Sequence, residues 1–60
     1  MKTLLSEYGS RDDKGAEIER IQNENGTAYK VTVYRSDKVL YEALFDDIER
    51  AESFAEDLTQ

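Results

Sequence analysis

Residues 27–45, with the sequence TAYKVTVYRSDKVLYEALF, constrain the fold more than any other part of this chain. Residues 27–34 are rich in β-branched and aromatic side chains, which suit a pleated and half-buried surface. Apolar side chains alternate with other residues there and again in residues 39–45, so the pattern predicts two antiparallel strands joined by a polar turn at residues 35–38. The odd positions predicted to share the buried face are Tyr29, Val31, Val33, Val39, Tyr41, Ala43 and Phe45.

Placing both apolar sets on one face fixes the register of this hairpin. The sum of paired positions must be even, which puts Val31 opposite Ala43 or Tyr41. A slip of one residue would turn every apolar side chain of the strand to the wrong face, so the pattern specifies the pairing strongly.

Residues 16–23, AEIERIQN, predict a third strand. Ile18 and Ile21 lie three positions apart, which breaks strict alternation. A helical turn would explain this spacing, and so would a β-bulge at residues 19–20. A strand is favoured because a turn signal and a clear strand follow directly.

That turn signal is the Asn-Gly pair at residues 25–26, whose two residues tolerate positive φ. A two-residue turn would pair Ile18 with Val33. A three-residue loop with a glycine bulge would pair Ile21 with Tyr29. The sequence leaves both alternatives open.

The apolar period changes from 2 to 3.6 after residue 45, which predicts a helix. Asp46 is positioned to cap the helix, and Glu49 completes a capping-box pattern. We expect the helix to end near Leu58 or Thr59, because acidic residues oppose the macrodipole in a last turn. The predicted apolar stripe consists of Ile48, Ala51, Ala55 and Leu58, with Phe54 at its flank.

Together these elements predict an α+β fold in which a three-stranded antiparallel meander (β-β-β-α) carries one C-terminal helix on its odd-numbered face. Residues 16–60 would form this single domain. Residues 1–15 are expected to be a flexible segment, or to dock on the sheet as a short helix or an added edge strand through Leu4, Leu5 and Tyr8.

The composition limits both stability and chemistry. A chain of 60 residues buries only about 60% of its unfolded surface. It contains neither cysteine nor histidine, so its stability must come from a small core, oligomerisation or a partner. We expect a cytoplasmic protein, because the sequence contains neither a secretory apolar region nor a membrane span.

No residues form a recognisable catalytic or cofactor-binding pattern. The four serines have no activating base beside them, and the three glycines are too scattered for a phosphate loop. Asp46, Asp47 and Glu49 could hold calcium weakly, but helix capping is the favoured interpretation. The sequence therefore predicts a protein that is not an enzyme, has no cofactor and has no metal site.

The even-numbered sheet face indicates a contact surface, because Tyr34, Leu40 and Leu44 would gather there. The alternatives are that Leu4, Leu5 and Tyr8 cover them, or that they show the ordinary partial exposure of a small domain. Of the net charge of −6, residues 46–60 carry −5. Our main hypothesis is a protein-interaction module that binds a partner protein or forms a homodimer through this face. The predicted partner-binding residues are Tyr34, Leu40, Leu44, Glu49, Glu52 and Glu56.

In one version of this hypothesis, the acidic helix provides an electrostatic surface that binds a basic partner. The chain would then be an accessory or inhibitor protein of a mobile element, whose carboxylates imitate nucleic-acid phosphates. This comparison is an analogy from size and charge.

The alternative function is nucleic-acid binding through the sheet. In element order, residues 16–58 resemble the arm-type DNA-binding domains of some recombinases. That resemblance implies phosphate contacts, for which Arg20, Lys30, Arg35 and Lys38 are the candidates, and base stacking on Tyr34. Nucleic acid is nevertheless disfavoured as a partner, because such binding normally requires an excess of positive charge.

Overall fold

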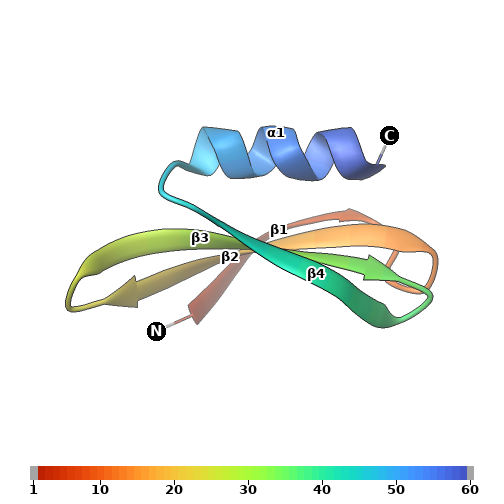
Figure 1. The fold of residues 1–60 in the computed structure, drawn as a ribbon, viewed down its shortest axis with the longest axis horizontal. Coiled ribbons are helices and arrows are strands. Elements are labelled where there is room, and N and C mark those ends of the chain that lie inside the picture. Colours follow the sequence, from red (N-terminus) through yellow and green to blue (C-terminus); the bar gives the residue numbers. More distant parts are fainter. Residues whose placement is uncertain (1, 60) are drawn as a thin grey trace.

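The computed structural model describes residues 2–59 as an antiparallel sheet with one helix against one of its faces (Figure 1). The sheet order is β1-β2-β3-β4, a simple meander. The α+β class and the C-terminal helix are confirmed, whereas the predicted number of strands was wrong, because the sheet has four. The elements are β1 (Lys2–Gly9), β2 (Lys14–Asn23), β3 (Gly26–Arg35), β4 (Lys38–Phe45) and α1 (Ile48–Thr59).

The additional strand is the N-terminal segment, which forms an edge strand as in one of the docking alternatives. β1 pairs with β2 from Gly9, which lies opposite Gly15, back to Lys2. Its register shifts between Leu4 and Ser6. That shift interrupts the alternation along the strand, so the sequence of β1 lacks the pattern by which the other strands are recognised.

β2 and β3 pair without interruption, and both predicted registers were wrong. Ile18 lies opposite Val31, and Ile21 lies opposite Ala28. β2 therefore contains neither a helical turn nor a bulge. Its two isoleucines simply point to opposite faces of the sheet, because an odd spacing in a strand changes the face.

The position of the turn explains this register. The turn residues are 24–25 rather than 25–26, and Gly26 already pairs with Asn23. The Asn23 side-chain oxygen accepts a hydrogen bond from the Asn25 N–H at 2.8 Å. Gly26 has a φ of 131°, a conformation that is essentially restricted to glycine.

The β3–β4 hairpin confirms the predicted register along most of its length, because Val31 lies opposite Ala43. Its turn has positive φ at Ser36 and Asp37 (53° and 66°), as in a type I′ turn. The register then shifts between Val33 and Tyr34, so that Val39 lies opposite Tyr34. Val39 therefore shares the face of Tyr34, and its predicted place on the helix-covered face was wrong.

The core lies between the sheet and α1 and confirms the predicted face of the hairpin. Phe54 of the helix approaches the ring of Tyr41 at 6.2 Å and the ring of Phe45 at 5.2 Å between centroids. Small helix residues let the helix backbone approach the strands closely. The buried cluster consists of Ala16, Ile18, Val31, Val33, Ala51 and Ala55.

Both ends of the helix are held by side chains. Asp47 caps the first turn, accepting a hydrogen bond from the Glu49 N–H at 2.8 Å. The expected cap at Asp46 was therefore wrong by one residue. The Thr59 hydroxyl donates to the Ala55 carbonyl oxygen at 2.9 Å, and the helix ends at Thr59 as expected.

Candidate protein-interaction surface

The sheet face opposite the helix is polar at its centre. Lys30 on β3 lies between two carboxylates, with its Nζ 3.6 Å from Glu19 on β2 and 3.3 Å from Glu42 on β4. The hydrogen bond to Glu42, and further the attraction of Glu19, raise the pKa of Lys30. These three residues therefore neutralise one another in part across the middle of the open face.

Tyr34 is covered rather than exposed. Only 6% of its surface is accessible. The guanidinium carbon of Arg11 lies 4.2 Å from the centre of its ring, and Arg11 donates a hydrogen bond of 3.0 Å to its hydroxyl. That hydroxyl donates in turn to Glu17 at 3.3 Å. Burial, followed by the charge of Glu17, raises the pKa of Tyr34 although Arg11 opposes the shift.

Backbone hydrogen bonds hold Arg11 in this position. The loop between β1 and β2 lies against the turn between β3 and β4. The Ser36 N–H donates to the Asp13 carbonyl oxygen at 3.0 Å, and the Asp37 N–H donates to the Arg11 carbonyl oxygen at 2.9 Å. The β1–β2 loop thus covers the open face at the end where the β3–β4 turn lies.

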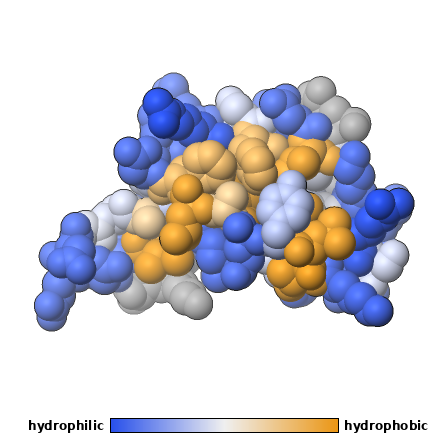
Figure 2. Space-filling view, in the orientation of Figure 1, coloured by the Kyte–Doolittle hydropathy of each residue, from blue (hydrophilic) through white to orange (hydrophobic). Residues whose placement is uncertain are grey.

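The exposed apolar surface lies instead along the edge strand β4. The exposed fraction is 54% for Val39, 55% for Leu40, 43% for Tyr41 and 67% for Leu44. Figure 2 shows apolar side chains gathered on the side of the molecule where β4 passes in front of the sheet, with hydrophilic residues at both ends. An apolar strip on an edge strand is a typical place for another chain to bind.

β4 also has an edge that no other described strand covers. It is the last strand of the sheet order and pairs only with β3. The backbone groups on its outer side can therefore form hydrogen bonds with an added strand. The register shift leaves Leu40 without a paired residue on β3, which limits regular pairing at the start of β4 more than at its end.

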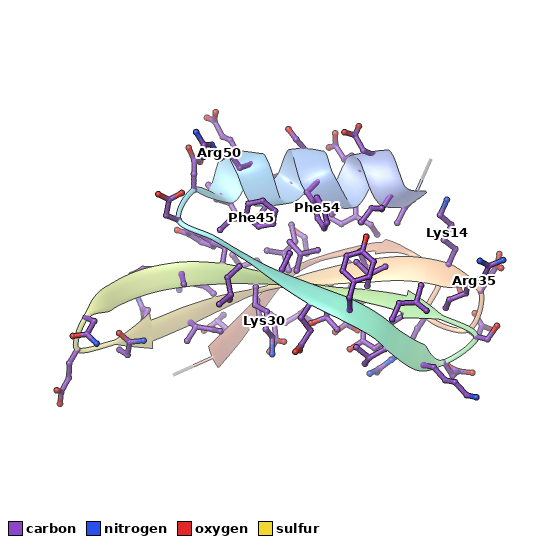
Figure 3. The ribbon with its side chains drawn as sticks, viewed as in Figure 1. Lys14, Lys30, Arg35, Phe45, Arg50 and Phe54 are labelled. Atoms are coloured by element: carbon purple, nitrogen blue, oxygen red, sulfur yellow. The ribbon has the colours of Figure 1, made fainter. Side chains whose placement is uncertain are left out.

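An open groove continues this strip at the C-terminal end of β4. Figure 3 shows Phe45 and Phe54 directed into the space between β4 and α1, with Arg50 on the helix above them. The residues that line the groove are Phe45, Asp47, Glu49, Arg50, Ser53 and Phe54. Two aromatic rings are thus bordered by two carboxylates and one guanidinium.

The structure brings only some of the predicted partner-binding residues together. Leu40 and Leu44 lie on the same edge strand, and Glu49 borders the groove next to it. Tyr34 lies on the open face beneath Arg11. Val39 and Tyr41 were missed, because the alternating pattern assigned both to the covered face.

The remaining predicted residues, Glu52 and Glu56, lie near β1 rather than near β4. Burial raises the pKa of Tyr8 on β1, and the charges of Glu52 and Glu56 raise it further. Part of the acidic surface of α1 therefore lies toward β1, on the far side of the sheet order from β4.

The basic residues of the nucleic-acid hypothesis do not form a shared surface. Arg20 lies opposite Tyr29, and so belongs to the helix-covered face. Lys30 is engaged by two carboxylates. Only Arg35 and Lys38 lie together, opposite each other beside the β3–β4 turn.

Within residues 2–59, no group of three or more acidic, cysteine or histidine side chains is placed to hold a metal ion. The one helix of that range is too short and too polar to cross a membrane. Comparisons of the chain with protein-family models, curated proteins and solved structures gave no match.

Proposed function

We propose that this protein is a non-enzymatic interaction module that binds an extended segment of a partner protein at the edge of β4. The observation that carries the proposal is the concentration of exposed apolar side chains on one uncovered edge strand. Strand addition uses both features at once, because backbone groups provide hydrogen bonds while alternate side chains provide specificity.

The size of the surface is consistent with moderate affinity. Fully burying one exposed leucine or valine contributes about 1.5–3 kcal/mol. The side chains of β4 are only about half exposed, so each can contribute about half of that amount. Association itself costs at least about 4 kcal/mol. Backbone hydrogen bonds and neighbouring polar contacts must therefore supply part of the affinity.

Charge favours a different protein over a second copy of this one. Each chain carries a net charge of −6, so two copies repel each other, whereas a partner segment with basic residues is attracted. Self-association through β4 is the competing outcome, and light scattering over a range of concentrations detects it.

Selection from a displayed library of random peptides, with the whole protein as bait, tests the proposal. We expect enriched peptides with alternating apolar residues, whose binding is lost in Leu44→Asp and Leu40→Asp. Both variants should remain folded, because these side chains are exposed.

Leu4→Asp is the matched control, because Leu4 is a leucine of similar exposure (51%) on the opposite edge strand. It should leave binding unchanged. Loss of binding in Leu4→Asp but not in Leu44→Asp would assign the docking edge to β1. Unfolding of Leu40→Asp would place that residue in the core and remove it from the surface.

A further inference from the structure

We infer that the groove between the end of β4 and the start of α1 receives a lysine or arginine side chain of the docked segment. This inference rests on the proposed function, and it specifies the chemistry of the partner. Phe45, the last residue of β4, forms one wall of the groove, so the groove directly continues the edge strand. A residue at the end of an added strand would reach it.

The walls of the groove suit a cationic side chain with an apolar stem. The rings of Phe45 and Phe54 are tilted by 51° to each other, with 5.2 Å between their centres. Aromatic faces attract lysine and arginine. The methylene groups of these residues can pack on apolar surface while the charged end stays near water.

The border of the groove carries an excess of negative charge. Asp47 and Glu49 line it together with a single cation, Arg50, and Asp46 precedes them in the chain. Among residues 2–59, Arg11 and Lys30 are the basic side chains that form ion pairs, and their partners lie on β2 and β4 rather than on α1. A partner cation would therefore meet carboxylates that form no ion pair with a described basic side chain, although Arg50 borders the same groove.

The other end of β4 carries basic residues, so a docked segment should prefer its own basic residue at one end rather than the other. Lys38 opens β4 and lies opposite Arg35, while Asp37 lies in the turn and Asp13 in the loop that is hydrogen-bonded to that turn. A basic residue is thus favoured more at the Phe45 end than at the Lys38 end. In a segment added antiparallel to β4, the Phe45 end receives its N-terminal residue.

Three synthetic peptides test this arrangement: acetyl-Lys-Val-Thr-Val-Thr-Val-Gln-amide, the same peptide with glutamine in place of lysine, and a third with lysine moved to the last position. We expect the first to bind about three- to ten-fold more tightly than the neutral peptide at low salt. High salt should reduce this difference. The third peptide should bind no better than the neutral one.

Variants of the protein assign the effect to the groove. Glu49→Gln should weaken the first peptide while leaving the neutral peptide unchanged. Asp57→Asn, which removes an exposed carboxylate from the other end of the same helix, should affect neither. Equal binding of the first and neutral peptides, with Leu44→Asp abolishing both, would overturn this inference and leave the proposed function intact. If no peptide binds at all, the proposed function itself is contradicted.

Discussion

The two inner strands and the two edge strands of this sheet differ in the regularity of their pairing and in the exposure of their apolar side chains. β2 and β3 pair residue by residue over their full length, and they contribute most of the buried cluster. Each edge strand contains one register shift, at Leu5 in β1 and at Leu40 in β4. The exposed large apolar residues among those described are also confined to the edge strands.

This difference separates the source of stability from the candidate binding surface. Inner-strand side chains are removed from water within the chain, so their contribution is made during folding. The exposed apolar side chains of the edge strands remain accessible to water. Bulges interrupt regular pairing at an edge, so the shifts at Leu5 and Leu40 shorten the stretch of each edge that can pair regularly with another strand.

The largest expected effect comes from an inner-strand truncation. Ile18 is fully buried, so Ile18→Ala should lower the free energy of unfolding by about 2–5 kcal/mol. Leu44→Ala, at an edge position 67% exposed, should change it by less than about 0.5 kcal/mol. Urea denaturation measures both values. Because Ile18→Ala can unfold so small a domain, Ile18→Val serves as the milder variant, with an expected loss of about 0.5–1.5 kcal/mol. Similar values for Ile18→Val and Leu44→Ala would contradict the distinction between inner and edge strands.

The next effect concerns the turn that fixes β1 to the sheet. Gly9 has a φ of 66°, and an added Cβ would collide with the Lys14 carbonyl oxygen. Gly9→Ala should therefore destabilise the fold by about 1–3 kcal/mol and increase hydrogen exchange along β1. Gly9→Asn separates the two causes, because asparagine tolerates this φ but keeps the Cβ. If Gly9→Asn were as stable as the natural chain, the collision would be absent.

A smaller effect is expected where the β1–β2 loop covers the open face. Arg11→Ala removes the contact with the Tyr34 ring and the hydrogen bond to its hydroxyl. The expected loss is about 1 kcal/mol, accompanied by increased exposure of Tyr34 to a fluorescence quencher. Tyr34→Phe keeps the ring contact and should cost less than Arg11→Ala. The reverse order would mean that the hydroxyl network, rather than the stacked guanidinium, holds the loop.

Alkaline pH should produce the smallest change. The pKa values of Tyr8 and Tyr34 are raised above 10.0 by burial, and the pKa of Lys30 is raised above 10.5 by its bond to Glu42. Because the pKa of each group is higher in the folded than in the unfolded chain, its contribution to stability is fully present at pH values below the unfolded-state pKa. That stabilisation is lost as pH rises through the folded values.

The free energy of unfolding should therefore not change through these groups up to about pH 9 and should fall above about pH 10. Denaturation at several pH values measures this decline. The decline should be weaker in a chain carrying both Tyr8→Phe and Tyr34→Phe, and an unchanged decline would assign it to other groups.

Much of the fold could be predicted because its pattern is local. Alternation in residues 27–45 predicted the face and most of the register of the β3–β4 hairpin, and the change of period predicted α1. The register shifts were not predictable, since they depend on pairing between strands. For residues 1–15 the edge strand was one of three alternatives, beside a flexible segment and a short docked helix, because the shift at Leu5 removes the alternation that would have identified β1.

The candidate site could be predicted only in part for the same reason. Leu40 and Leu44 are apolar residues on a clear strand, and the structure exposes both. Tyr34 was grouped with them, but its cover comes from Arg11, 23 positions away in a polar loop. Val39 and Tyr41 were both assigned to the covered face. The register shift places Val39 on the open face instead, and Tyr41 is on the covered face but accessible at the edge of the sheet.

The most direct test of β4 as the docking edge is an NMR titration of the isotope-labelled protein with a peptide selected from the library. We expect the largest backbone amide shifts along β4, with intermolecular contacts between the peptide backbone and that strand. Shifts confined to β1, or to the open face around Lys30, would contradict it.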